Sequence, residues 1–373
     1  FGNHHPLGRS DLGRMPIKIQ TSGGTTGMPR PTLFDPISME VQGIQTARGF
    51  HSQGARPGDV IQIAGTLSLA NAGWTAYTAA FNWLGCSPLT TGSGRVTPSE
   101  RQLELAAAFG TNGWYIIGDY LGRLAQVAAD MNFDLHQLPT KYIFTFLGPD
   151  AESGMRGKLE EAWGAPVYDN YGSHEIGLVA FECASKTRHI NEDTVYLEIC
   201  DENDGRALPD GEIGYLWVKG DSNARCYWNN PEKTEATMRG EWLNTGDMYC
   251  LSPEGYYVNM GRGDDMLKVG GIWCSPLEIE EHLLKHPKVR EAAVVGRADS
   301  DGLLKPAAYV VLRDCGDAGE PTTNELIQHC KSGLAGYKYP RWFVFIDELP
   351  KTVTGKVQRF QLRQRSGLDA DMA

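Results

Sequence analysis

Two hydrophobic patterns alternate along the first 150 residues of the chain. The stretch "SMEVQGIQTARGFHSQG" (38–54) spaces its apolar residues as an amphipathic helix does. Short apolar runs typical of buried strands follow at "DVIQIAG" (59–65), "NGWYIIGD" (112–119) and "KYIFTFLG" (141–148). Helices that alternate with strands at this spacing predict a mostly parallel sheet in an α/β domain.

The pattern changes between residues 194 and 220. The segment "TVYLEICDENDGRALPDGEIGYLWVKG" begins and ends with strand-like runs, and Asn-Asp-Gly and Pro-Asp-Gly turns separate them. This order predicts a small antiparallel β segment attached to the first domain.

A second domain is predicted after the Gly-Arg-Gly turn at 261–263. Its expected elements are, in order, a helix at 275–286, strands at 291–299 and 306–314, a helix at 323–336 and a strand at 341–347. We therefore expect an α/β chain with a large domain at 1–263 and a smaller α+β domain at 264–373. The length of 373 residues also favours two or three domains.

Composition excludes several classes of function. The chain has 46 acidic and 35 basic residues and a net charge of −11, so nucleic acid or an anionic membrane is not the expected partner. No apolar run approaches the roughly 20 residues that span a bilayer. The eight cysteines are scattered without a Cys-x-x-Cys pair, which predicts a reducing compartment, the cytoplasm, rather than a disulfide scaffold.

The stretch "TSGGTTGMPRPT" (21–32) is rich in glycine and hydroxyl side chains. Such a loop lets backbone N–H groups and hydroxyls surround a phosphate, and Arg30 adds a positive charge. A flexible surface turn has the same composition, so the loop by itself leaves both interpretations open. It is neither a Walker A loop nor a dinucleotide-binding glycine motif.

Four later motifs favour the phosphate interpretation. They are "YDNYGSHEIG" (168–177), "WLNTGDM" (242–248), "GRGDDMLKVGGIWCSPLEIE" (261–280) and "PKTVTGKVQR" (350–359). In this order, and over essentially the whole chain, the five motifs resemble the adenylate-forming superfamily of acyl-CoA synthetases, adenylation domains and luciferases. Residues 1–220 look more like phenylacetate-CoA ligases, and residues 221–373 more like benzoate-CoA ligases.

The resemblance implies a large N-terminal α/β domain, a small antiparallel β segment and a mobile C-terminal α+β domain. It implies that a carboxylic acid, of the benzoate or phenylacetate type, reacts with ATP to give an acyl-adenylate and pyrophosphate. Transfer to coenzyme A would then release AMP. Mg²⁺ would accompany the ATP. The oligomeric state does not follow from the sequence.

The resemblance also assigns roles to single residues. Thr25, His174, Glu175 and Lys356 would be catalytic, Glu175 would bind the metal, and Asp264 would be the hinge of the mobile domain. His174 stands where relatives usually carry Thr or Ser, so it either meets the α-phosphate or is an imidazole at the edge of the core. The expected ATP and CoA ligands are Ser22, Gly24, Thr26, Gly27, Arg30, Gly148, Asn170, Tyr171, Gly172, Ser173, Asp247, Arg262, Lys268, Gly270 and Gly271.

The acyl pocket of the superfamily falls near "LSLANAGW" (67–74) and "TTGSG" (90–94) in this chain. Asn71, Trp74 and Gly92 are the candidates for it, although a Trp in an apolar stretch is commonly plain core. A zinc site is not expected, because Cys183, His189 and Cys250 supply three ligands where structural zinc normally takes four.

Two other functions share these motifs. One is an adenylating enzyme that loads the acyl group onto the phosphopantetheine of a carrier protein, and the other is a non-catalytic nucleotide-binding relative. Relatives usually place a hundred or more residues before the phosphate loop, whereas this chain has twenty. We therefore expect an N-terminal segment to be missing.

Overall fold

The computed structural model describes residues 16–22, 30–147, 155–351 and 357–368. By Cα proximity the chain divides into two compact units. The first contains residues 1–198 and 217–245, and the second contains residues 199–216 and 246–373. The sequence predicted a domain boundary between residues 263 and 264, defined by a hinge motion. This boundary stays a prediction.

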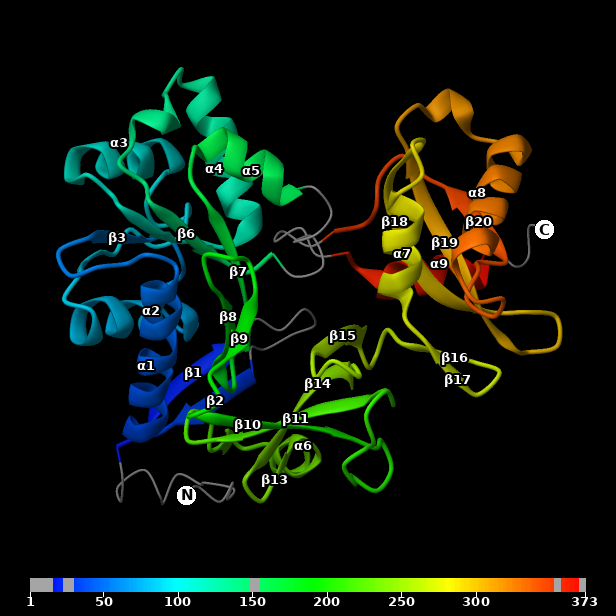
Figure 1. The fold of residues 1–373 in the computed structure, drawn as a ribbon, viewed down its shortest axis with the longest axis horizontal. Coiled ribbons are helices and arrows are strands. Elements are labelled where there is room, and N and C mark those ends of the chain that lie inside the picture. The colour runs from blue at the N-terminus through cyan, green and yellow to red at the C-terminus, as the bar shows by residue number, and fades with distance from the viewer. Residues whose placement is uncertain (1–15, 23–29, 148–154, 352–356, 369–373) are drawn as a thin grey trace. The chain divides into compact units, whose positions relative to one another are not determined.

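A seven-stranded sheet is the centre of the first unit (Figure 1). Its strand order is β4 (Ser87–Leu89), β3 (Val60–Ile63), β5 (Gly113–Tyr115), β6 (Tyr142–Thr145), β7 (Val167–Ser173), β8 (Gly177–Glu182) and β9 (Arg188–Ile190). The strands from β4 to β7 pair in parallel, while β7–β8 and β8–β9 are antiparallel. The predicted parallel sheet is therefore confirmed, with an antiparallel edge.

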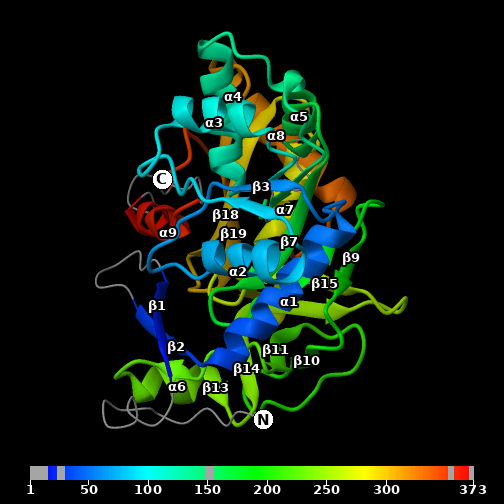
Figure 2. The same cartoon turned by 90° about the vertical axis from the view of Figure 1, so that its left-hand side faces the viewer.

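Helices cover both faces of this sheet (Figure 1, Figure 2). On one face lie α3 (Ser99–Phe109), α4 (Gly118–Asp130) and α5 (Met155–Trp163), and on the other α1 (Pro36–Ser52) and α2 (Ala72–Thr78), which a π-helical turn at Ala79–Trp83 extends. One buried cluster includes Trp114 and Trp163, whose ring centroids are 5.1 Å apart. The other packs Phe50 of α1 against Phe144 of β6. Parallel strands buried on both faces explain why these runs are apolar without alternation.

Two smaller sheets complete the β structure of this region. β1 (Lys18–Ser22) and β2 (Arg30–Phe34) form an antiparallel pair, and β12 (Cys226–Tyr227) pairs with β2. The predicted antiparallel segment is part of a five-stranded sheet. Its members are β10 (Val195–Cys200), β11 (Gly214–Gly220), β14 (Trp242–Leu251), β13 (Met238–Arg239) and β15 (Tyr257–Arg262), with α6 (Pro231–Thr237) before β13.

The second unit contains a three-stranded sheet and a hairpin. The sheet consists of β18 (Val289–Ala298), β19 (Leu304–Leu312) and β20 (Trp342–Phe345), and the hairpin of β16 (Leu267–Val269) and β17 (Ile272–Cys274). α7 (Pro276–Leu284) and α8 (Glu320–Gly333) pack on one face of the sheet, and α9 (Arg359–Leu368) on the other. Because successive side chains of a strand point to opposite faces, Val294 of β18 packs in the core under α7 and α8, and Val295 packs in the core under α9.

Local signals fix several helix starts. Asp35 accepts a hydrogen bond from the N–H of Ser38 at 2.8 Å and is followed by a proline at the first helical position of α1. Ser275 does the same for α7, where it accepts from the N–H of Glu278 at 3.3 Å. Two short 3₁₀ turns lie at Leu135–Gln137 and Cys315–Asp317. No helix in the described parts of the chain is long and apolar enough to cross a membrane.

The close packing of β5 against β6 gives a stability prediction. Gly113 lies opposite Tyr142, and a Cβ at Gly113 would overlap the Tyr142 ring. We expect Gly113→Ala to lower the free energy of unfolding by about 2–3 kcal/mol, because a buried ring between two strands cannot move aside. Urea denaturation of both proteins measures this.

Gly157 of α5 is the matched control, since a Cβ there meets nothing within 4 Å. Gly157→Ala should leave the midpoint unchanged or raise it, because alanine favours a helix by about 1 kcal/mol. Equal midpoints for the two variants would contradict the tight packing at Gly113.

Candidate active site

The glycine- and threonine-rich loop begins and ends on paired strands. β1 and β2 are in register with Ser22 opposite Arg30, and Thr21 donates its N–H to the carbonyl of Leu69 at 2.8 Å. The two ends of the motif are thus held by sheet hydrogen bonds. Gly24, Thr25, Thr26 and Gly27 lie outside the described residues, as does the side chain of Ser22.

The carboxylate of Glu175 is held by two hydroxyl groups. Tyr227 donates its hydroxyl to Oε1 at 3.1 Å, and the Ser173 hydroxyl donates to Oε2 at 3.2 Å. Tyr227 is on β12, opposite Thr32 of β2, so one side chain links Glu175 to the strand that follows the phosphate loop. Burial raises the pKa of Tyr227, and the charge of Glu175 raises it further, so the phenol remains a donor at neutral pH.

The turn that carries Glu175 is fastened by a distant segment. The Glu175 carbonyl accepts the N–H of Ala224 at 2.7 Å, and the next residue, Arg225, pairs with buried Asp35 at the start of α1. Gln42 of α1 donates to the carbonyl of Ser222 at 2.7 Å. The position of Glu175 is therefore fixed from α1 through residues 222–225.

His174 combines burial with an unused nitrogen. Its ring lies edge-on to Phe34 with the centroids 5.7 Å apart, and its buried Nε2 has no hydrogen-bond partner among the described residues. Burial lowers the pKa of His174, and the neighbouring Glu175 opposes that shift only in part. The imidazole is therefore neutral at pH 7. Both interpretations of His174 fit this position, so its catalytic role stays a prediction.

The remaining residues of this motif are brought together on β7. The amide of Asn170 is fully engaged by protein, because it donates to the carbonyls of Thr145 and Tyr168 and accepts from Gln53 at 2.9 Å. Its observed role is structural, and contact with a nucleotide stays a prediction. Tyr171 is half-buried. Gly172 has a packing reason, since a Cβ there would overlap the carbonyl of Gly177. Gly148 lies outside the described residues.

Asp247 and Arg262, both expected near a ribose, are cross-strand neighbours on β14 and β15. Arg262 Nη1 donates to Asp247 Oδ1 at 2.8 Å. Gly246, with φ +75°, lies against the guanidinium, which would be 2.7 Å from a Cβ at this position. The sequence predicted that both residues lie near the ribose, and the structure shows in addition that their side chains pair with each other.

The predicted CoA residues lie on the β16–β17 hairpin. Gly270 and Gly271 are the two turn residues between Val269 and Ile272, with φ of +60° and +83°. A two-residue hairpin of this kind needs positive φ at both positions, so the glycines have a conformational reason apart from any ligand. Lys268 lies 4.4 Å from the centroid of the Trp273 ring and pairs with Glu202 at 2.9 Å.

Asp264, the expected hinge, is exposed in the turn between β15 and β16. Lys356 lies outside the described residues, but its flanks are well anchored. Lys351 and Val357 form an antiparallel bridge, and Gln358 donates its N–H to the carbonyl of Pro350 at 2.7 Å.

Arg359 anchors the helix that follows. It pairs with buried Glu280 at 2.7 Å and with Asp265 at 3.7 Å. Glu280 also accepts the N–H of Val294 at 2.6 Å. A buried carboxylate with a guanidinium and a backbone donor is stable only while all partners remain, so α9 is tied firmly to this unit.

The three acyl-pocket candidates have different surroundings. Asn71 is buried and donates to Gln42, Trp74 donates its indole N–H to the carbonyl of Ser68 at 2.9 Å, and Lys18 lies 4.7 Å from the Trp74 ring centroid. Gly92 has φ +71° and donates its N–H to Ile63 at the end of β3. Their membership of one pocket stays a prediction.

Three side chains support the motif residues in a way that the sequence did not indicate. Tyr227, Asp35 and Arg225 act on the motif residues from distant positions. Nothing in a single sequence marks a residue that acts through strand pairing. Within the described ranges, no group of three or more His, Cys, Asp or Glu side chains could hold a metal ion.

The chain matches two family patterns. Residues 11–228 match "AMP-binding enzyme", and residues 278–356 match "AMP-binding enzyme C-terminal domain".

Curated relatives include a benzoate–CoA ligase from Thauera aromatica. It is 36% identical over an alignment of 367 residues that covers 92% of this chain and 64% of that protein. A 4-hydroxybenzoate–CoA/benzoate–CoA ligase from Rhodopseudomonas palustris is 48% identical over 169 residues, 44% of this chain and 31% of that protein. The chain thus spans less than two thirds of the length of these relatives. The likeness to a benzoate–CoA ligase extends well beyond residues 221–373.

Among solved structures, the anthranilate CoA ligase AuaEII in complex with anthranoyl-AMP is 31% identical to this chain. The TM-score is 0.74, and the match covers 96% of this chain and 69% of that one. The predicted fold class is confirmed by this similarity. Because the first family pattern matches more than half of the chain and the second follows it in order, the chain belongs to the AMP-binding enzyme family of adenylate-forming proteins.

Proposed function

We propose that the protein activates an aryl carboxylic acid with ATP and transfers the acyl group to coenzyme A. The observation that supports this most directly is the Glu175 carboxylate, which Tyr227 ties to the strand after the phosphate loop. The named relatives act on benzoate, 4-hydroxybenzoate and anthranilate, which supports an aryl acid as substrate. They are CoA ligases, which favours free CoA over a carrier protein as acceptor.

In the first step a carboxylate oxygen attacks the α-phosphorus of ATP, and the bond to pyrophosphate breaks. The acid is already an anion at pH 7, so the step needs no general base. The protein must hold two anions together and stabilise the charge that develops on the phosphate. We assign this task to the loop at 22–30, His174 and Lys356.

Glu175 fits a Mg²⁺ that accompanies ATP. A hard cation takes oxygen ligands, and a site with one protein carboxylate leaves its other positions to phosphate oxygens and water. Bound there, Mg²⁺ would neutralise part of the phosphate charge. Tyr227 and Ser173 orient the carboxylate for this purpose.

In the second step the thiol of CoA attacks the acyl carbonyl, and AMP leaves. We assign the ribose of the nucleotide to Asp247 and Arg262, whose pairing presents a carboxylate beside a guanidinium. Lys268 and the Gly270–Gly271 turn are the proposed CoA residues, because a turn without side chains allows close approach of a ligand. Asp264 is the proposed hinge, because its own side chain is exposed in the turn between β15 and β16.

The first functional prediction concerns the proposed catalytic lysine. We expect Lys356→Ala to lower benzoate-dependent ATP–pyrophosphate exchange by about 100-fold or more, because a fixed charge at the transferring phosphoryl group is lost. Thioester formation from preformed benzoyl-AMP should fall far less. Lys331→Ala on α8 is the control, and equal exchange in the two variants would contradict the role of Lys356.

The second prediction concerns the hydroxyl that holds Glu175. We expect Tyr227→Phe to lower the exchange rate by about tenfold, since a hydrogen bond to a charged group is removed. The loss should shrink when MgCl₂ is raised, because more cation compensates for a poorly oriented ligand. Tyr196→Phe, at an exposed position, should have no effect. A Tyr227→Phe enzyme with unchanged magnesium dependence would refute the link.

The third prediction concerns the substrate. In exchange assays with benzoates, phenylacetates, cinnamates and fatty acids, aryl acids should have a kcat/KM at least about tenfold above that of fatty acids, as expected of a shaped apolar pocket. A preference for fatty acids would overturn the proposed substrate class, and the absence of exchange with every acid would favour a non-catalytic relative.

A further inference from the structure

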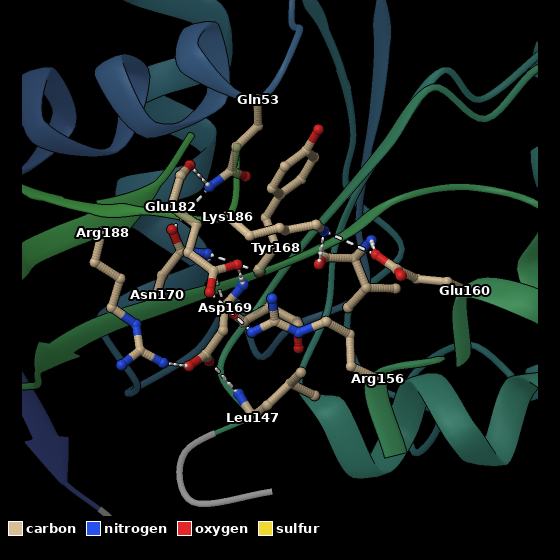
Figure 3. A network of polar contacts seen from close by, with 12 residues as sticks. Gln53, Leu147, Arg156, Glu160, Tyr168, Asp169, Asn170, Glu182, Lys186 and Arg188 are labelled. Carbon is tan, nitrogen blue, oxygen red and sulfur yellow. Dashed lines mark hydrogen bonds and ion pairs between the residues drawn. The ribbon is translucent and has the colours of Figure 1, made fainter. Parts of the chain in front are cut away.

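Two ion pairs with opposite polarity join α5 to the end of β8 and to the turn that follows β8 (Figure 3). Arg156 of α5 pairs with Glu182 at 2.8 Å, and Glu160, one helical turn later, pairs with Lys186 at 2.8 Å. Both acids also accept a backbone N–H of β7 at 2.8 Å, Glu182 from Asp169 and Glu160 from Val167. Both pairs therefore connect α5 to β7, one through the last residue of β8 and the other through the turn after β8.

The two pairs differ in burial. The side chains of Arg156 and Glu182 are 16% and 4% exposed, whereas those of Lys186 and Glu160 are 31% and 32% exposed. A charge removed from the first pair leaves its partner uncompensated in a poorly hydrated place, while water screens the second pair.

The two ion pairs also differ in the further residues to which they are hydrogen-bonded. Asp169, whose N–H binds Glu182, is itself buried, and its carboxylate accepts the N–H of Leu147 at 2.6 Å and pairs with Arg188. Leu147 and Arg156 lie on either side of residues 148–154. Two buried carboxylates and two guanidiniums, balanced in charge, thus join both flanks of that segment to β7 (Figure 3).

The same connection continues into the candidate site. Gln53 of α1 donates through one nitrogen to the carbonyl of Glu182 at 3.1 Å and to Oδ1 of Asn170 at 2.9 Å. Asn170 then leads directly to Tyr171 and to the turn after β7, which contains Glu175. Glu182 thus binds β7 at Asp169, next to Asn170, and a shift of Glu182 acts on the part of β7 that leads to Tyr171. Glu160 and Lys186 bind the N–H and the carbonyl of Val167 at the start of β7, and Lys186 lies over the Tyr168 ring.

We propose that Arg156, Glu182 and Asp169 form a positioning network for the nucleotide. It fixes the spacing of Leu147 and Arg156 and the path of β7 into Tyr171–Glu175. None of the three touches the reacting atoms. The Glu160–Lys186 pair fastens α5 without this effect. The proposal rests on the proposed function in that the ligand is ATP, but it does not depend on which acid is activated.

The test compares Glu182→Gln with Glu160→Gln, each of which removes the acidic partner of one of the two ion pairs of α5. ATP affinity is measured by titration calorimetry with MgATP, and KM and kcat by pyrophosphate exchange. We expect Glu182→Gln to weaken ATP binding and to raise the KM for ATP by about tenfold, with the KM for the acid and kcat at saturating ATP within about threefold of the parent values. Glu160→Gln should stay within about threefold in all of them.

Asp169→Asn provides a second, nearly isosteric variant. Its amide oxygen still accepts the N–H of Leu147 but loses the charge opposite Arg188, so we expect a smaller rise in the KM for ATP than with Asp169→Ala. These two variants keep the proposal testable if Glu182→Gln does not fold. Thermal unfolding of every variant ensures that the assays are done well below each midpoint.

The possible results test the positioning network and the proposed function separately. Equal ATP affinity in Glu182→Gln and Glu160→Gln, or equal KM for ATP in Asp169→Asn and Asp169→Ala, would overturn the network. If Glu182→Gln weakened the binding of the acid as much as that of ATP, the role of Glu182 would be purely structural, and the proposed network would be overturned as well. MgATP binding without acid-dependent exchange in the parent protein would remove the proposed function, while the affinity comparison would still decide the network.

Discussion

The geometry of the candidate site depends on the hydrogen bond between Tyr227 and Glu175. It joins the sheet of β1, β2 and β12 to the turn at the end of β7, so that the strand after the phosphate loop and the expected metal ligand share one support. Glu175 is also held through its own carbonyl by Ala224, beside the Arg225–Asp35 pair. A carboxylate with two hydroxyl donors and a fixed backbone is already oriented before a ligand arrives, which lowers the cost of binding a cation there.

Buried carboxylates in both units are paired with guanidinium groups. Asp169 and Glu182 are compensated by Arg188 and Arg156 in the first unit, and Glu280 by Arg359 in the second. Such pairs add little net stability compared with apolar packing, but they tolerate few alternative arrangements because an unpaired buried charge is costly. Each lies next to a segment with a predicted role in catalysis. Variants of the network around Glu182 test whether such pairs fix the geometry of these segments.

The two units have separate architectures and separate cores. The first carries Glu175 in a turn of the helix-covered seven-stranded sheet, and the strands that flank the glycine-rich loop in the small sheet of β1, β2 and β12. The second anchors both flanks of Lys356 through a β bridge and the Arg359–Glu280 pair.

The sequence by itself determined the fold class, the order of most elements and the family. The apolar runs of β3, β5 and β6 and the amphipathic spacing of α1 are local signals, and the five motifs are recognisable because their chemistry needs particular residues at fixed spacing. Only the tertiary structure decided which distant residues support those motifs. Tyr227 reaches Glu175 through strand pairing, and Glu182 reaches Leu147 through Asp169, over separations that carry no periodic signal. It also showed that Gly172 and the Gly270–Gly271 pair have steric and conformational reasons, because close approach and positive φ are properties of the folded backbone.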